Sequence, residues 1–183
     1  MRIIAGEFRG RKLLAPDGEV TRPVTDRVKQ SLFDILAPGL PDARVYDCFA
    51  GTGSMGLECL SRGAARVVFF EKDRSAVARL KQNIGALGLE QSSQVIASDI
   101  FAYFSRNTQP PADLVFFDPP YRFVVEEPGK LQSFSEHLAE HLSEDAIVVF
   151  RHDSRDRLEL PKLVQYDERS YGGMTLEFLR LGR

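Results

Sequence analysis

The sequence predicts an α/β protein of the Rossmann-like class, with a mainly parallel seven-stranded sheet and helices on both faces. From residue 44 onward, short apolar runs alternate with helical patterns, which is typical of parallel strands joined by crossover helices. The runs are continuously apolar, as expected of strands that are buried on both faces. Two further runs near the C-terminus are separated by Gly172 and Gly173, which predicts an antiparallel hairpin at one edge.

The length and composition indicate one domain. The 183 residues are 43% hydrophobic and contain no repeat, low-complexity tract or long linker. We therefore expect a single domain over residues 1–183 that acts as a monomer. Residues 1–40 would form an N-terminal extension, and residues 41–183 would form the Rossmann-like core.

The N-terminal extension is expected to hold a small β-hairpin and a helix. "RIIAG" and "RKLLA" flank "EFRGR", in which a glycine allows a turn. Thr25 is a suitable N-cap for a helix with Asp26 in its first turn, and "APG" would end that helix. The apolar stripe expected on this helix comprises Val28, Leu32, Ile35 and Leu36.

The core is expected to contain five parallel strands followed by the hairpin. The apolar runs place the parallel strands at residues 44–49, 65–71, 93–98, 112–118 and 146–151. Helical patterns occur at residues 74–87 and 131–142. The two strands of the C-terminal hairpin are expected at residues 162–171 and 175–181.

The composition argues against several classes of protein. No run of 18 apolar residues occurs and the N-terminus lacks the features of a secretory signal, so we expect a cytoplasmic protein without membrane contact. Two cysteines cannot build a disulfide framework. "HLAEH", residues 137–141, has the histidine spacing of some zinc proteases, but we interpret both histidines as part of a solvated helix face and expect no metal.

A glycine-rich stretch, "DCFAGTGSMG" at residues 47–56, follows the first core strand and opens a helix. Gly51, Gly53 and Gly56 would let backbone amides approach a ligand at the helix N-terminus. Glu71 ends the next strand, where an acid that binds a ribose is expected. Two ligands fit this pattern, a nicotinamide dinucleotide and S-adenosylmethionine, because both carry a ribose diol.

Two more acids at strand ends favour S-adenosylmethionine. Asp47, on the first strand, would repel a pyrophosphate but attract the ammonium group of a methionine. Asp99 follows the third strand and could accept a hydrogen bond from an adenine amino group. Together with Glu71, these acids predict a binding site at the carboxyl edge of the sheet.

The fourth strand ends in "DPPY", which predicts the catalytic residues Asp118, Pro119, Pro120 and Tyr121. Pro120 biases Pro119 away from helical geometry and supplies no competing N–H, so the Pro119 carbonyl can point outward. Asp118 and this carbonyl would accept hydrogen bonds from both N–H groups of an exocyclic amino group, holding its nitrogen in line with a sulfonium methyl group. Tyr121 would stack on the base.

At this point the chain resembles a known family. "RIIAGEFRGRKL", "RPVTDRVKQSLFDIL", "DCFAGTGSMGLECLSRGA" and "FFDPPY", in this order and spacing, resemble the bacterial 16S rRNA (guanine-N2) methyltransferase D family within the class I S-adenosylmethionine-dependent methyltransferases. The resemblance covers residues 2–123. It implies transfer of a methyl group to N2 of a guanine in 16S rRNA, within a small-subunit ribosomal particle.

The resemblance also implies which residues make the site. The target base would contact the "DPPY" residues. The residues expected to bind S-adenosylmethionine are Asp47, Phe49, Ala50, Gly51, Gly53, Glu71, Lys72, Asp99 and Ile100.

Basic residues near the N-terminus are the expected RNA contacts. The net charge of the chain is −2, yet residues 1–30 hold seven Lys/Arg against four Asp/Glu. These residues could contact phosphates or could form a solvated face around the hairpin, and the resemblance favours RNA. The expected RNA-binding residues are Arg9, Arg11, Arg22, Thr25 and Arg27.

Other functions stay open at the level of sequence. An adenine-N6 or a glutamine methyltransferase would use the same "DPPY" chemistry, because each of these targets is an NH2 group whose lone pair is delocalised. A non-catalytic RNA-binding module would not bind S-adenosylmethionine. A nicotinamide oxidoreductase would instead bind a dinucleotide tightly.

Overall fold

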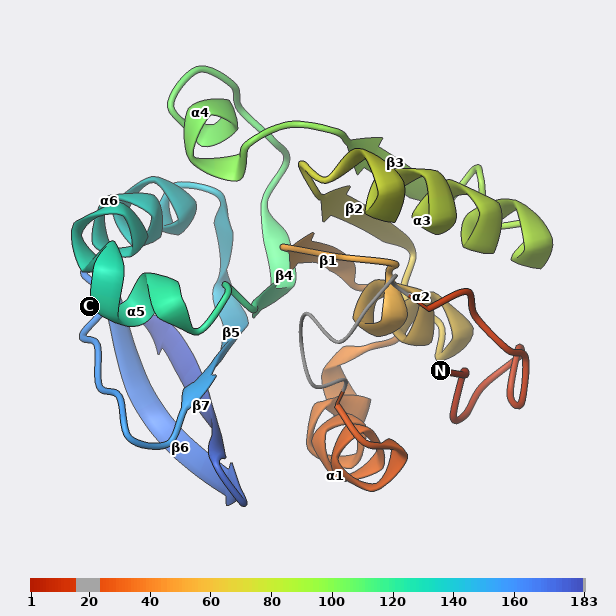
Figure 1. The fold of residues 1–183 in the computed structure, drawn as a ribbon, viewed down its shortest axis with the longest axis horizontal. Helices are drawn as coiled ribbons and strands as arrows, with labels where there is room; N and C mark the ends of the chain where they lie inside the picture. The colour runs from red at the N-terminus through yellow and green to blue at the C-terminus, as the bar shows by residue number, and fades with distance from the viewer. Residues whose placement is uncertain (16–23, 183) are drawn as a thin grey trace.

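The computed structural model describes residues 1–15 and 24–182 of the chain (Figure 1). Within these residues, the centre is a seven-stranded sheet with the strand order β3-β2-β1-β4-β5-β7-β6. Five strands run parallel, and the last two form an antiparallel hairpin whose strand β7 pairs with β5. The strands are β1 (Arg44–Cys48), β2 (Arg66–Phe70), β3 (Ser93–Ile96), β4 (Ala112–Phe117), β5 (Leu142–Asp153), β6 (Leu163–Tyr171) and β7 (Met174–Leu181).

Helices cover both faces of this sheet, which confirms the predicted fold class (Figure 1). One face carries α1 (Asp26–Leu36), α2 (Ser54–Ser61) and α3 (Arg74–Leu87), and the short η1 (Ala37–Gly39) follows α1. The other face carries α4 (Ile100–Phe104), α5 (Arg122–Glu126) and α6 (Pro128–Ala139).

Each face of the sheet has its own apolar core because successive strand residues point to opposite sides. Val45 packs in the core beneath α1, α2 and α3, with Phe33 and Leu80. Its neighbour Tyr46 packs in the core beneath α4, α5 and α6, with Phe104. Strands buried in this way from both sides read as continuously apolar runs, which is why the sequence located them. The expectation is wrong for β3, which lies at the edge of the sheet and is only half-buried.

The helices differ from expectation where they are short or where proline sets their start. α3 occupies the predicted residues 74–87, whereas α6 begins and ends three residues earlier than predicted. Pro128 lies in the first turn of α6, where its missing N–H costs nothing, and Leu142 instead begins β5 and pairs with Ala112. α4 and α5 span five residues each, too few to show a helical period.

The predicted N-terminal hairpin is reduced to one antiparallel bridge, between Arg2 and Lys12. The amides of Ile4 and Ala5 do not pair across the turn; they donate to the carboxylate of Glu58, at 2.8 and 3.0 Å. The segment is therefore a short hairpin docked on α2, whose arms are joined by backbone hydrogen bonds such as that from the Ile3 amide to the Arg11 carbonyl at 3.0 Å.

Helix α1 begins as predicted, with the Thr25 hydroxyl accepting a hydrogen bond from the Val28 amide at 3.4 Å. Its buried face differs from the predicted stripe, since Ile35 is 37% exposed while Phe33 and Lys29 are buried with Leu32 and Leu36. Lys29 is buried because its ammonium group pairs with Glu58 of α2 at 2.9 Å. A charged residue thus occupies a position that an apolar pattern cannot reveal.

Candidate active site

The loop that follows β1 is shaped by three residues with positive φ. Phe49, Gly51 and Gly53 have φ values of 63°, 56° and 86°, and α2 begins at the next residue. A Cβ on Gly51 would meet no atom within 4 Å, whereas one on Gly53 would lie 2.4 Å from Leu80. Of these two glycines, Gly51 therefore faces open space and Gly53 makes room for α3.

The third glycine of the motif serves packing rather than ligand approach. A Cβ on Gly56 would lie 2.3 Å from the ring of Phe69, so glycine lets α2 lie close against β2. Its amide donates to Oδ2 of Asp47 at 2.9 Å. The expectation that Gly56 presents its amide to a ligand is therefore wrong.

Glu71 also binds the glycine loop. Its Oε2 accepts a hydrogen bond from the Gly51 amide at 2.8 Å, and its Oε1 accepts one from the Asp73 amide at 2.8 Å. Two loop amides, those of Gly51 and Gly56, thus already bind carboxylates. This loop differs from a phosphate-binding loop, whose free amides point at an anion.

Asp47 lies at the bottom of the site with 2% of its surface exposed. Burial raises its pKa to about 8, and the nearby carboxylates of Asp118 and Glu71 act in the same direction. The Gly56 amide and the Lys29 ammonium oppose this rise. A cation placed among these acids would be stabilised because it would offset their mutual repulsion.

Asp99 and Lys72 lie at the neighbouring strand ends. Oδ1 of Asp99 caps α4 by accepting from the Phe101 amide at 3.0 Å, and Oδ2 lies 3.6 Å from the Lys72 ammonium. Ile100 follows in the buried first turn of α4. The ring of Phe49 lies 5.9 Å from that of Phe101, so an aromatic wall adjoins these polar groups. The sequence did not single out Phe101.

The "DPPY" residues lie directly after β4, beside the end of β1. The Pro120 carbonyl accepts from the Phe123 amide at 2.8 Å and so opens α5. No hydrogen bond to the Pro119 carbonyl occurs within the described residues, which leaves this acceptor available. Asp118 follows Phe117, whose partner on β1 is Cys48, so Asp118 and Asp47 lie at adjacent strand ends.

Arg151 is a site residue that the sequence reading missed. Its Nε donates to Oδ1 of Asp118 at 2.5 Å, and its guanidinium lies 5.6 Å from the centre of the Tyr121 ring. Burial raises the pKa of Asp118, and the Arg151 charge opposes that rise. In the sequence Arg151 is only a charged residue after the apolar run "AIVVF", and its place beside Asp118 depends on the pairing of Phe150 with Phe117.

Comparison with known proteins defines the family. The chain matches the family model described as "Conserved hypothetical protein 95" over residues 1–180. It is 43% identical over 122 residues to "Ribosomal RNA small subunit methyltransferase D" of Escherichia coli (strain K12), covering 67% of this chain and 61%, less than two thirds, of that protein. The chain belongs to the ribosomal RNA small subunit methyltransferase D family.

Solved structures agree with this family. The Escherichia coli protein yhhF superposes with a TM-score of 0.85 at 34% identity, covering 99% of this chain and 97% of that chain. SMU.776, solved in complex with SAH, has a TM-score of 0.70 at 14% identity and covers 88% of this chain and 50% of that chain. At that identity SMU.776 shows a shared fold alone.

The structure does not bring Arg9 and Arg11 to this site. The turn that contains Arg9 docks on the far end of α2, where the Glu7 amide donates to the Ser61 carbonyl at 2.8 Å. Arg11 donates to the Ala86 carbonyl at 2.8 Å, near the end of α3. Both helices start at the carboxyl edge of the sheet and end at the opposite edge, so these arginines lie away from Asp118.

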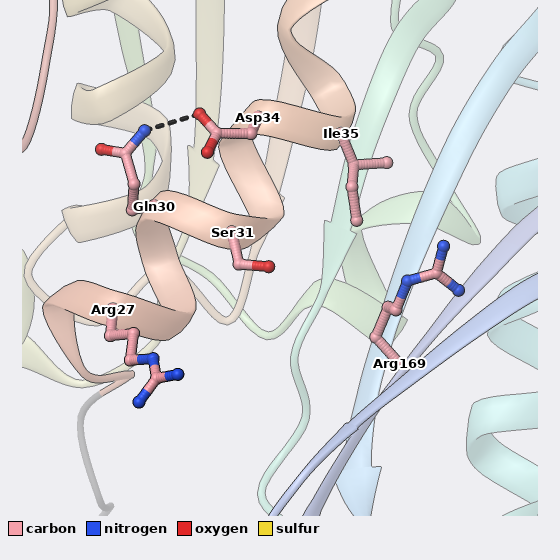
Figure 2. Close-up of a pocket in the computed structure, with 6 residues that line it drawn as sticks. All are labelled: Arg27, Gln30, Ser31, Asp34, Ile35 and Arg169. Atoms are coloured by element: carbon pink, nitrogen blue, oxygen red, sulfur yellow. Dashed lines mark hydrogen bonds between the residues drawn. The ribbon is translucent and has the colours of Figure 1, made fainter.

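The other expected RNA contacts divide into three cases. Thr25 caps α1 with its hydroxyl, and Arg22 lies outside the described residues. Arg27 lines an open groove of about 580 Å³ between α1 and β6 (Figure 2). The lining residues are Arg27, Gln30, Ser31, Asp34, Ile35 and Arg169.

The groove is connected by contacts to the "DPPY" residues. The hydroxyls of Ser31 and Tyr171 lie 2.8 Å apart and join α1 to the end of β6. Tyr171 pairs across the hairpin with Met174, whose sulfur lies 3.9 Å from Nη1 of Arg151. Arg151 in turn binds Asp118, so the groove and the candidate catalytic residues share one side of the molecule.

The remaining ionisable candidates do not form a metal site. His137 is exposed as expected, but His141 is buried against the Phe104 ring at 5.3 Å, because α6 ends at Ala139 and does not carry it. The expectation of two solvated histidines is therefore wrong for His141. Among the described residues, no group of three His, Cys, Asp or Glu side chains could hold a metal ion, and no helix is long and apolar enough to cross a membrane.

Proposed function

We propose that the protein is an S-adenosylmethionine-dependent methyltransferase that modifies the exocyclic N2 amino group of a guanine in 16S rRNA. The observation that carries this proposal is the meeting of Asp47 and Asp118 at the ends of adjacent strands, with a glycine loop on one side and Tyr121 on the other. Acids suited to a cationic donor thus adjoin acceptors suited to an amino group. Membership of the family supports an rRNA substrate.

The residues present fit S-adenosylmethionine. This cofactor, when bound, supplies a methyl group on a positively charged sulfonium. Glu71 lies next to the open face of Gly51, and a cationic ligand would favour the ionised form of Asp47, so both carboxyl groups would favour the ammonium and sulfonium groups. We assign Glu71 to the ribose hydroxyls and Asp99 to the adenine, with Lys72 and Ile100 beside them. The loop after β1 would line the cofactor site with Phe49, Ala50, Gly51 and Gly53.

The "DPPY" residues would hold the target amino group. Oδ2 of Asp118 has no hydrogen-bond partner within the described chain, and neither does the Pro119 carbonyl. Two such acceptors match the two N–H donors of an exocyclic amino group, whose nitrogen would then face the methyl group. As the C–N bond forms, the bond between the methyl carbon and sulfur would break and leave its electron pair on sulfur; the nitrogen must then lose one proton, and Asp118 is positioned to accept it. The Tyr121 ring would orient the base by stacking.

A nicotinamide dinucleotide fits these residues poorly. Its pyrophosphate needs free amides at the helix N-terminus, but those of Gly51 and Gly56 already donate to Glu71 and Asp47. Phosphate charges would also meet two carboxylates there. The same argument leaves an adenine-N6 or glutamine methyltransferase as the second candidate, because the "DPPY" chemistry is shared.

We further propose that the groove between α1 and β6 receives the RNA strand that flanks the target nucleotide. Arg27 and Arg169 lie on opposite sides of it (Figure 2). Guanidinium groups on both walls suit a phosphodiester backbone, and phosphate contacts would fix the register of the strand. A small-subunit particle in the cytoplasm is the proposed substrate, and a monomer is the proposed active form.

The test is methyl transfer from labelled S-adenosylmethionine to naked 16S rRNA and to small-subunit particles from an unmethylated strain. The proposal expects label in the particles, and nucleoside analysis should place it on N2 of guanine. Label on adenine N6 or on protein would favour the second candidate. Absence of cofactor binding by calorimetry would contradict the proposed enzyme altogether.

A further inference from the structure

Arg151 connects the two parts of the target site. It lies on β5 immediately beyond the register pair Phe117 and Phe150, so its side chain meets the residue that follows β4. Its side chain is 12% exposed and that of Asp118 is 23% exposed, which places the ion pair largely out of water. A pair shielded in this way is screened little by salt and holds its geometry better than a surface pair.

The contact between the two side chains is one-sided. The Nε of Arg151 donates to Oδ1 of Asp118, and its Nη1 points toward the sulfur of Met174. Oδ2 of Asp118 therefore keeps its full capacity to accept a hydrogen bond. The guanidinium also lies over the Tyr121 ring, at 5.6 Å from its centre, within the range of a cation–π contact.

We propose that Arg151 is the positioning residue of the site: it favours the ionised form of Asp118 and turns Oδ2 toward the target amino group. This inference rests on the proposed function. A carboxylate with one oxygen fixed presents the other in a single direction, which is the preorganisation that transition-state stabilisation requires. The arginine itself need not touch the base.

The charges around Asp118 explain why such a residue is needed. The charge of Asp118 raises the pKa of both Asp47 and Tyr121, so a second carboxyl group and a phenol lie within its electrostatic range. Burial also disfavours a charged Asp118. Arg151 is the cation that pairs with Asp118 in the described chain, and without it the pKa of this carboxyl group would rise further.

The experiment compares Arg151→Gln, Arg151→Lys and wild type in single-turnover methyl transfer to small-subunit particles across pH 5–9. Arg151→Gln should lower the rate about 10–100-fold at pH 7 and move the acidic limb of the profile upward by about 1–3 pH units, the range by which a close opposite charge lowers a carboxyl pKa. Arg151→Lys should keep the limb near its wild-type position because it retains the charge. Its rate should lie between the other two.

Arg155→Ala is the matched control, since Arg155 pairs with Asp153 on the same side of the molecule but is 87% exposed. Its profile should match wild type. In the Asp118→Asn background, Arg151→Gln should have little additional effect, because the arginine acts through the carboxylate. Additive losses would overturn the proposal.

A second readout does not depend on activity. Carbon-13 NMR titration of the Asp118 carboxyl, assigned with Asp118→Asn, should give a higher pKa in a folded Arg151→Gln variant than in wild type. An equal pKa in both would overturn the inference about Arg151. Failure of wild type to transfer any methyl group would contradict the proposed function instead, so the two failures are distinguishable.

Discussion

Oδ2 of Asp47 accepts a hydrogen bond from the Gly56 amide at 2.9 Å, in a position where Asp47 is 2% exposed. This bond fastens the end of β1 to the first turn of α2. It also keeps a carboxyl group inside the protein with its pKa raised to about 8, chiefly by burial. The buried acid should cost stability in the ligand-free protein and favour a cationic ligand.

The first prediction follows from that pKa. A native pKa above the unfolded value means that the folded state binds more protons between about pH 4 and pH 8, so the stability of wild type falls as the pH rises through this window. Asp47→Asn removes the charge and keeps an acceptor for Gly56. The ligand-free variant should melt several degrees higher than wild type at pH 8, because each kcal/mol of added stability raises the melting temperature by about 2–4 °C. The difference should shrink toward pH 4.

Calorimetry on the same variant should show weaker binding of S-adenosylmethionine than wild type. If the difference in melting temperature between variant and wild type stayed constant across pH 4–8, the charge of Asp47 would not be the cause of the lower stability. Unchanged cofactor affinity would separate Asp47 from the cofactor site while leaving the pH argument intact.

The second prediction concerns Glu71, which holds the Gly51 amide at 2.8 Å. Glu71→Ala should weaken binding of S-adenosylmethionine by about 1.5–3 kcal/mol, the scale of hydrogen bonds to a charged group. Glu71→Gln should lose less, because one oxygen still accepts. Glu7→Gln, an exposed change at the opposite edge of the sheet, is the control and should bind normally. Equal affinity of Glu71→Ala and wild type would exclude Glu71 from the site.

Local patterns in the sequence predicted some residues of the candidate site. Asp47, Glu71 and Asp118 were singled out because each lies at or just after the end of an apolar strand, and parallel strands bring their carboxyl ends to one edge. Arg151 was missed because its meaning depends on the pairing of β5 with β4, which alternation alone does not give.

The N-terminal extension was harder to predict because its contacts are distant in the chain. Glu58 accepts from the amides of Ile4 and Ala5 and pairs with Lys29 and Arg62. No short-range pattern connects these residues. The result is a short hairpin docked on α2, which turns the expected RNA contacts at its tip away from the site.

The third prediction tests that docking. Glu58 is fully buried and binds two cations, so Glu58→Gln would leave Lys29 and Arg62 without a counter-charge. The free energy of unfolding measured in urea should fall by about 3–5 kcal/mol, as for other buried pairs that lose one partner. Asp26→Asn breaks the exposed Arg2–Asp26 pair and should change the free energy of unfolding by less than about 1 kcal/mol. Equal small losses would show that the buried pair does not hold the extension.

The fourth prediction concerns RNA. Arg27→Ala and Arg169→Ala should each lower affinity for the small-subunit particle and make its salt dependence shallower by up to about one unit of slope per lost phosphate contact. Arg9→Ala, at the opposite edge of the sheet, should leave the slope unchanged. Filter binding at several salt concentrations measures all three variants. A shallower slope for Arg9→Ala alone would place the RNA on the N-terminal turn instead of the groove.

The most direct test of the central claim is single-turnover methyl transfer by Asp118→Ala, with binding of S-adenosylmethionine measured in parallel. The variant should bind the cofactor as wild type does and transfer the methyl group roughly 10²–10³-fold more slowly, the scale for loss of one preorganised electrostatic contact. Asp118→Asn should retain more activity because its amide oxygen still accepts one hydrogen bond. Equal single-turnover rates for Asp118→Ala and wild type would contradict the account.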